Sequence, residues 1–167
     1  MKNQNVELKP MEDLKYKVIM EIKSNLAPVV TIGEIGKGIL RWVPIIGGTF
    51  EGPGHNGVEL KGTVLPYGQD LQLIKPNGEW ELDALYMLQT EQNEIILINS
   101  KVTRFGNSED LINLRDGKPY NIDGIKGAGF TVFEVSSPRL QWMKHHTFFP
   151  LGKRYPNGVE VQICMLY

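Results

Sequence analysis

Two carboxylates and one histidine are the side chains of this sequence best suited to move a proton. Glu51 lies among the glycines of segment 47–54, where partial burial could raise the pKa of its carboxyl group. Asp70 follows in a predicted strand and could line a cavity with Glu51 as one of an acid and base pair. His145 could serve as the acid in place of Asp70, because histidine titrates near neutral pH. Such a set would suit isomerisation, dehydration or cyclisation.

Each of these carboxylates also has an interpretation that involves no chemistry. Glu51 could be a solvated loop residue, and Asp70 could be a hydrogen-bonded residue at the start of a strand. The glycines around Glu51 could serve only to permit positive φ angles or a close approach of strands. Both interpretations stay open at the level of sequence.

Aromatic side chains could instead provide the surface of a binding site. We expect Phe50, Tyr86 and Trp142 to contact a small, mainly apolar organic ligand inside a barrel, with Asp70 orienting that ligand. This binding hypothesis needs no catalytic base. A third hypothesis is a structural or partner-binding module whose barrel interior is filled by side chains and holds no cavity.

Ligands for a metal ion are scarce in this chain. It has three histidines, with His55 far along the sequence from His145 and His146, and one cysteine, so we expect no bound metal. Segment 47–54 lacks the Gly-Lys-Ser/Thr ending of a phosphate-binding loop and precedes no predicted helix. We therefore expect no cofactor.

The composition is that of a globular protein and restricts its partners. Eighteen Lys and Arg against nineteen Asp and Glu give a net charge of -1, too balanced for nucleic acid to be the expected partner. No apolar run approaches the roughly 20 residues that span a bilayer, so we expect no membrane insertion. A single cysteine and no apolar N-terminal segment predict a cytoplasmic protein. The sequence is compatible with a monomer or a homo-oligomer.

Alternation of apolar and polar residues predicts β-strands along most of the chain. The alternation is clearest in segments 14–23, 58–64, 80–89, 94–104 and 159–165. Turn signals separate these segments, at Pro76-Asn77-Gly78, Glu91-Gln92-Asn93 and Pro156-Asn157-Gly158. Long strands without crossover helices predict an all-β fold, a closed antiparallel β-barrel.

Helical signal is confined to one place. Ser108 and the acids after it predict a short helix over 108–114, and the aperiodic, glycine-rich residues 105–129 predict a long loop around that helix. A chain of 167 residues suits one core. We therefore predict an N-terminal extension over residues 1–13 and a single barrel domain over residues 14–167, with at most one or two short helices.

Several short motifs are specific enough to compare with a known family. Within residues 41–90 they are Gly47-Gly48-Thr49-Phe50-Glu51-Gly52-Pro53, Val64-Leu65-Pro66, Asp70, and Leu82-Asp83-Ala84 with Tyr86. Looser matches follow at Phe133-Glu134 and Trp142-Met143-Lys144. On these motifs the chain resembles, over most of residues 14–167, the family labelled domain of unknown function 3237.

The resemblance implies a compact β-barrel but no particular activity, because one fold can carry many functions. Four positions depart from the family pattern: Tyr67 for a glycine, Leu71 for a tryptophan, Asn77 for a turn aspartate and Leu85 for an arginine. Any family site that uses that arginine is absent from this chain.

Overall fold

Ten strands make up most of the computed structural model, which describes residues 8–167. The strands are β1 (Tyr16–Leu26), β2 (Val30–Glu34), β3 (Ile39–His55), β4 (Val58–Val64), β5 (Gly68–Ile74), β6 (Trp80–Thr90), β7 (Ile95–Gly106), β8 (Ile125–Val135), β9 (Phe148–Tyr155) and β10 (Gly158–Leu166). The helical elements are α1 (Ser108–Arg115) and two 3-10 segments, η1 (Ile122–Gly124) and η2 (Pro138–Lys144). Residues 1–7 of the predicted N-terminal extension lie outside the described residues.

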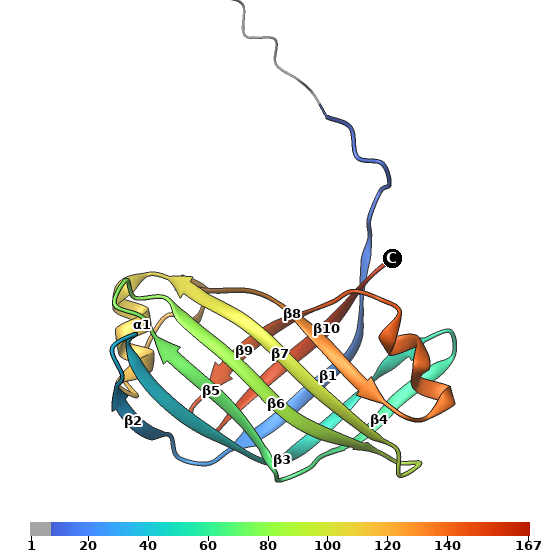
Figure 1. Cartoon of the computed structure of the whole chain (residues 1–167), viewed down its shortest axis with the longest axis horizontal. Coiled ribbons are helices and arrows are strands. Elements are labelled where there is room, and N and C mark those ends of the chain that lie inside the picture. The colour runs from blue at the N-terminus through green and yellow to red at the C-terminus, as the bar shows by residue number, and fades with distance from the viewer. Residues whose placement is uncertain (1–7) are drawn as a thin grey trace, which may run out of the picture.

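The strands close into an antiparallel barrel because β1 pairs with β10 on one side and with β3 on the other (Figure 1). From β10 the order runs through β9, β8 and β7 to β6. The 17-residue β3 then pairs with β5 along its first half and with β4 along its second half, and both of these strands pair with β6. The prediction of a closed antiparallel barrel is confirmed.

The two ends of the barrel are covered differently. Helix α1 lies at one end and η2 at the other (Figure 1). Asn107 caps α1 by accepting hydrogen bonds from the backbone N–H groups of Glu109 and Asp110. The helix predicted over 108–114 is therefore confirmed. Within residues 8–167, no helix has the length and apolar character that crossing a membrane requires.

Period-two alternation sends one face of each strand into the barrel. Near η2 these inward side chains pack tightly, and Phe50, Leu88, Ile98 and Phe148 are almost wholly buried there. Near α1 a second, small cluster joins Ile74, Trp80 and Leu111. The space between the two clusters holds the polar interior described below.

Two glycine-rich segments are strands, although the sequence left a loop open for the first and predicted a loop for the second. Residues 47–54 lie within β3, where a Cβ on Gly48 would stand 2.0 Å from the backbone oxygen of Lys23. Gly48 also has a φ of 136°, so both the close strand approach and the positive φ angle predicted for these glycines are present. Residues 125–129, predicted as part of the 105–129 loop, begin β8.

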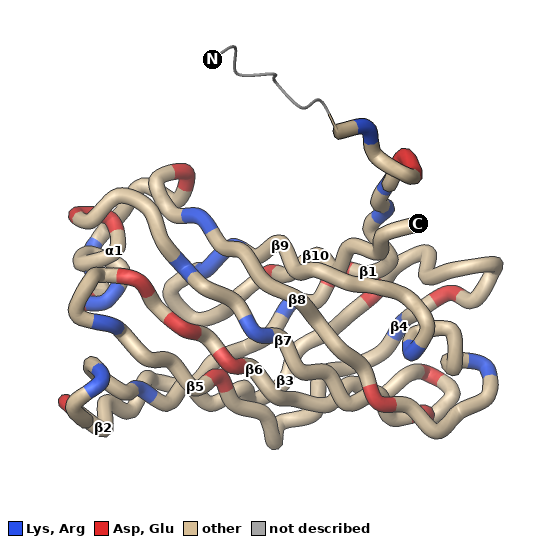
Figure 2. The backbone as a smooth tube through the Cα atoms, turned by 45° about the horizontal axis from the view of Figure 1, so that its top comes forward, with Lys and Arg blue, Asp and Glu red and all other residues tan. Residues whose placement is uncertain are grey.

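The two ends of the barrel chain lie side by side. The backbone N–H of Lys15 donates to the carbonyl of Tyr167, and that of Tyr167 donates to the carbonyl of Lys15. Figure 2 shows this contact at the base of the N-terminal segment, and it also shows charged positions of both signs interspersed along the strands. The barrel thus closes next to its own termini.

Candidate functional site

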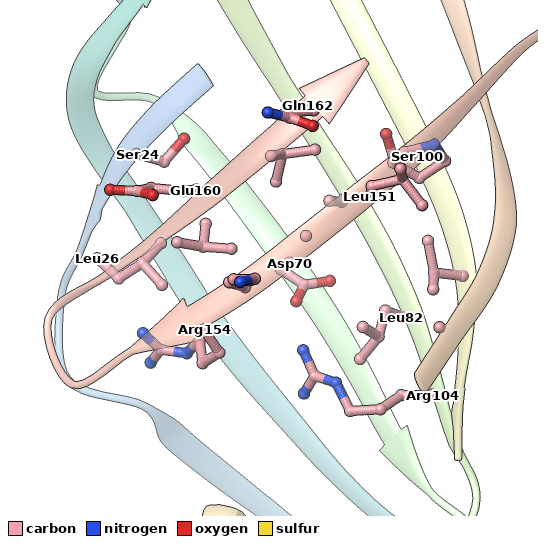
Figure 3. Close-up of a pocket in the computed structure, with 18 of the residues that line it drawn as sticks. Ser24, Leu26, Asp70, Leu82, Ser100, Arg104, Leu151, Arg154, Glu160 and Gln162 are labelled. Carbon is pink, nitrogen blue, oxygen red and sulfur yellow. The ribbon is translucent and has the colours of Figure 1, made fainter. Parts of the chain in front are cut away.

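A cavity of about 630 Å³ occupies the barrel between the packed end near η2 and the end covered by α1 (Figure 3). Much of its wall is apolar, with Leu26 from β1, Leu82 from β6, Val102 from β7 and Val161 from β10. Its polar lining comes from several strands and consists of Glu21, Ser24, Asp70, Gln72, Tyr86, Ser100, Arg104, Lys126, Lys153, Arg154, Tyr155, Glu160 and Gln162. The cavity therefore has apolar walls with convergent polar groups, the usual make-up of a small-molecule site.

The cavity opens where β8 and β9 separate. These neighbouring strands share one backbone pair, Thr131 with Phe148, although β8 pairs with β7 along its whole length. Beyond that pair, residues 125–127 of β8 and residues 150–155 of β9 line the cavity from the two sides of the gap. The gap in the wall provides a lateral entrance.

Asp70 is placed in the cavity by β5, where it lies between Val43 of β3 and Ala84 of β6. Its Oδ2 accepts a hydrogen bond of 2.7 Å from Nε2 of Gln72. Its Oδ1 is buried and accepts none from residues 8–167. Burial raises the pKa of Asp70, although the hydrogen bond from Gln72 and the charges of Arg104 and Arg154 oppose that shift. Burial and the charge of Asp70 also raise the pKa of Tyr86.

Two arginines enter the cavity near Asp70. Arg104 lies at the end of the inward face of β7, and its Cζ is 5.1 Å from the centre of the Trp80 ring, which orients the guanidinium. Burial lowers the pKa of Arg104 to about 10, so the group stays charged at neutral pH. Arg154 reaches in from β9, and its Nη1 donates to the carbonyl of Gly158 at 2.8 Å.

A third arginine lies next to this group. Arg41 of β3 also lies over Trp80, with its Cζ 5.2 Å from the ring centre, and its Nη1 donates to the carbonyl of Arg115 in α1. Burial lowers the pKa of Arg41, as do the charges of Arg154 and Arg115, while Asp70 acts in the opposite direction. The interior near α1 is therefore positively charged.

The structure does not bring Glu51 to Asp70. Glu51 alternates with the buried Phe50 and is paired with Glu21 of β1 and Lys61 of β4, with its side chain exposed. It is not among the residues that line the cavity. The reason is the strand period, because Phe50 points inward and its neighbour must then point outward. The expected pairing of these two carboxylates in one pocket is not seen.

The other predicted site residues divide between the cavity and the packed end. Tyr86 lines the cavity. Phe50 is buried in the core, and Trp142 lies in η2, with its ring centre 5.3 Å from that of His55. His145 is exposed at the end of η2. Of the expected set, Asp70 and Tyr86 share the cavity, whereas Phe50, Trp142 and His145 do not line it.

Sequence reasoning missed the two cavity arginines and Gln72. Arg104 lies on the same face of β7 as Ile96, Ile98, Ser100 and Val102. Alternation along this strand could therefore have predicted that Arg104 points into the barrel. Gln72 likewise shares a face with Asp70 and Ile74. Arg154 carries no comparable pattern, because the strand around it contains proline, glycine and lysine in place of alternating apolar residues.

Proteins of known sequence resemble the whole chain. A UPF0311 protein of Rhodopseudomonas palustris strain TIE-1 is 33% identical over 150 residues, which cover 90% of this chain and 95% of the relative. A UPF0311 protein of Bradyrhizobium diazoefficiens is 33% identical over 154 residues, covering 92% and 96%. A UPF0311 protein of Clostridium acetobutylicum is 26% identical over 157 residues, covering 92% and 95%.

Solved structures show the same barrel. A conserved protein of unknown function from Rhodopseudomonas palustris superposes with a TM-score of 0.86 at 30% identity, covering 94% of this chain and all (100%) of the other. A β-barrel-like protein from Acinetobacter baumannii gives 0.77 at 28% identity, covering 96% and 100%. An enzyme from Penicillium herquei gives 0.64 at 16% identity, covering 95% and 99%, which is a likeness of fold alone.

A family model matches nearly all of the barrel. The family is described as protein of unknown function, DUF3237, and the match extends over residues 14–166. This range includes every strand of the barrel and each residue that lines the cavity. The chain belongs to the DUF3237 family.

Proposed function

We propose that this protein binds a small organic molecule with a mainly apolar body inside its barrel. The observation that carries the proposal is the cavity of about 630 Å³, with apolar walls and convergent polar groups. Ligand sites of proteins commonly measure about 300–1,000 Å³ and have this make-up. The alternative of a filled barrel requires an interior without a cavity, and the residues between the two core clusters leave one.

Gly152 provides a way to block the entrance. It lies opposite Val161 in the β9–β10 pair and lines the cavity at the gap. A Cβ built on it would meet its nearest atom, Cγ2 of Val161, at 3.6 Å, an ordinary contact. A large side chain at this position should therefore be accommodated by the backbone and occupy the mouth of the cavity.

The test uses N-phenyl-1-naphthylamine, an uncharged probe whose fluorescence rises in apolar surroundings. Titration of the full chain should give saturable fluorescence, and Gly152→Phe should weaken the binding at least tenfold. Lys101→Phe is the matched control, because it adds the same ring to the exposed face of β7. Absence of saturable binding, or equal binding by the Gly152→Phe variant, would contradict the proposal.

A second candidate function, proton transfer at the same site, is favoured by the state of Asp70. Its Oδ1 is buried without a partner among the described residues, and burial raises the pKa of Asp70, which makes its carboxylate a stronger base than an exposed aspartate. Isomerisation, dehydration or cyclisation would each use such a group. Glu51 takes no part in this proton transfer, since it lies on the outer face.

The proton-transfer candidate can be tested with 2-tetralone in D₂O. Asp70 would take a proton from the carbon next to the carbonyl and return a deuteron, so proton NMR should show exchange faster than in buffer. Asp70→Asn should remove this acceleration while the naphthylamine probe still binds. Equal exchange rates in the two proteins would rule out Asp70 as the base.

A further inference from the structure

The charges inside the barrel do not balance. Arg41, Arg104 and Arg154 all lie close enough to Asp70 for its charge to act on them. At neutral pH these arginines carry three positive charges, and Asp70 offers at most one negative charge. Buried charges are costly unless they are paired. The interior therefore favours a ligand that brings negative charge.

The acidic residues near the cavity do not supply the missing charge. Glu160 alternates with the inward-facing Val159 and Val161, and its strand partner is the exposed Lys153. Glu21 alternates with the buried Ile22 and forms an ion pair of 3.5 Å with Lys23. Both carboxylates border the cavity, and each lies beside a lysine: Glu21 forms an ion pair with Lys23, and Glu160 is opposite Lys153 in the strand register.

Arg104 has its hydrogen-bond donors free. Among residues 8–167 no side-chain hydrogen bond is made by its guanidinium, and its Cζ lies 5.1 Å from the centre of the Trp80 ring. Its strand partner on β8 is Gly127, so no side chain from that position covers the guanidinium. A planar cation held by an aromatic ring, with its edge open, is suited to a carboxylate.

Arg154 adds positive charge beside Arg104 but is itself held by backbone carbonyls. Its Nη1 is held by the backbone carbonyls of Tyr155 and Gly158, which fixes the charge at the edge of the cavity (Figure 3). The backbone carbonyl of Arg154 also accepts a hydrogen bond of 2.6 Å from the hydroxyl of Tyr120. Arg154 therefore adds positive potential to the site from a fixed position.

The cavity also offers acceptors. Oδ1 of Asp70 and Oε1 of Gln72 are both buried and receive no hydrogen bond from the described residues. Each is on the inward face of β5. Buried acceptors of this kind are matched when a ligand supplies a donor such as a hydroxyl group.

Resting on the proposed binding function, we propose that the ligand is a hydroxylated organic acid. Its carboxylate binds Arg104 in the positive potential of Arg154, its hydroxyl group donates to Asp70, and its apolar body lies against Leu82 and Val102. One molecule then supplies a negative charge for the arginines and a donor for one of the two buried acceptors. Neither an uncharged apolar ligand nor a cation would supply both.

The test compares 6-hydroxy-2-naphthoate with its carboxamide, which has the same shape without the charge, and with 2-naphthoate, which lacks the hydroxyl group. Competition against the naphthylamine probe should show the hydroxy acid binding at least tenfold more tightly than the carboxamide. Arg104→Gln should remove that tenfold preference. Asp70→Ala should remove the preference for the hydroxy acid over 2-naphthoate.

Two controls make the result specific. Lys101→Gln removes one positive charge from the outer face of the same strand and should change no affinity. Arg154→Gln should weaken the acid but not the carboxamide, which covers the case in which Arg104→Gln fails to fold. Equal binding of acid and carboxamide overturns this ligand class while the proposed function stands. Failure of the naphthylamine probe to bind would instead overturn the proposed function.

Discussion

Asp70 shows how the neighbours of one residue decide what it can do. Two carboxylates of the same sequence segment, Glu51 and Asp70, end in opposite surroundings, one exposed and one in the cavity. Burial is the larger influence on Asp70, and the positive charges of Arg104 and Arg154 only partly offset it. The protein therefore favours the neutral form of this carboxyl group more than the unfolded chain does.

This preference predicts a pH-dependent gain of stability in Asp70→Asn. A folded-state pKa raised above the unfolded value means that the wild-type protein loses stability as pH rises through the folded pKa. Asparagine copies the neutral form at every pH. In urea unfolding the variant should be more stable than the wild type at pH 7, by about 1 kcal/mol, and this difference should vanish below the ordinary value of 3.8.

Asp83→Asn is the matched control for that comparison. Asp83 lies on β6 next to Asp70, where its Oδ1 accepts a hydrogen bond of 2.8 Å from Asn99. Its replacement should not stabilise the protein at any pH. If Asp70→Asn proved less stable than the wild type at pH 7, the arginines would outweigh burial and the carboxylate would be the favoured form.

At the level of elements, Glu94 is one of the polar groups that hold η2 over the packed end of the barrel. Glu94 of the β6–β7 turn receives hydrogen bonds from Arg139 and Ser137, and its ion pair with Arg139 joins the two elements. These hydrogen bonds, with that of Thr90, lower the pKa of Glu94 to about 2, with Arg139 as the largest cause. The core beneath includes Leu140 and Met143 of η2.

The lowered pKa predicts where Glu94→Gln destabilises the protein. A carboxyl whose folded pKa is depressed stabilises above its unfolded value of 4.5, and that stability is lost as pH falls toward about 2. At pH 7 the variant should lose about 1–2 kcal/mol in urea unfolding, since the partly exposed pair is screened by solvent. Near pH 2 the two proteins should unfold alike.

Glu91→Gln is the control for Glu94→Gln, because Glu91 lies in the same turn but pairs with Lys61 at 3.6 Å on the surface. An exposed pair of this kind contributes about 0–1 kcal/mol. A comparable loss of unfolding free energy in the two variants at pH 7 would contradict the prediction. It would mean that any change of charge in this turn destabilises the protein, and that the contact of Glu94 with η2 is not the cause.

Strand pairing explains which elements the sequence made predictable. Strands with strict alternation, such as β6 and β10, were predicted because one face is buried and the other is not. Strand β3 and the start of β8 were missed, since glycine and proline interrupt the period in the second half of β3 and glycines interrupt it in β8. Those glycines are needed because neighbouring backbones pass too close for a Cβ.

The cavity could not be predicted from residue patterns, for a related reason. Period two indicates which side chains share a face, such as Asp70, Gln72 and Ile74, but it left open whether that face points into the barrel. It does not indicate how far apart two strands lie around a barrel. Arg104 on β7, Arg154 on β9 and Asp70 on β5 meet only after closure, which depends on pairings between distant parts of the chain.

For the molecule as a whole, closure is completed by β1. This strand pairs with β10 at the other end of the sequence and with β3, so the barrel forms only when the first and last strands meet. Such long-range pairing is typical of domains that fold in milliseconds to seconds. The reciprocal backbone bonds of Lys15 and Tyr167 place the two chain ends at hydrogen-bond distance.

Adjacent ends predict that the barrel tolerates circular permutation. A linker of about four residues, a common hairpin length, should join Tyr167 to Lys15 because their backbones already pair. New termini between Asn77 and Gly78 would fall in an exposed turn, where cutting removes little buried structure. The permutant should keep the β-sheet circular dichroism spectrum and bind the naphthylamine probe.

A permutant opened between the central β7 residues Ile98 and Asn99 is the control. It should neither keep that spectrum nor bind the probe, because β7 pairs with both β6 and β8 there. Failure of the permutant opened at the turn to fold would contradict the prediction, and equal folding of the two permutants would show that the barrel does not need a continuous β7.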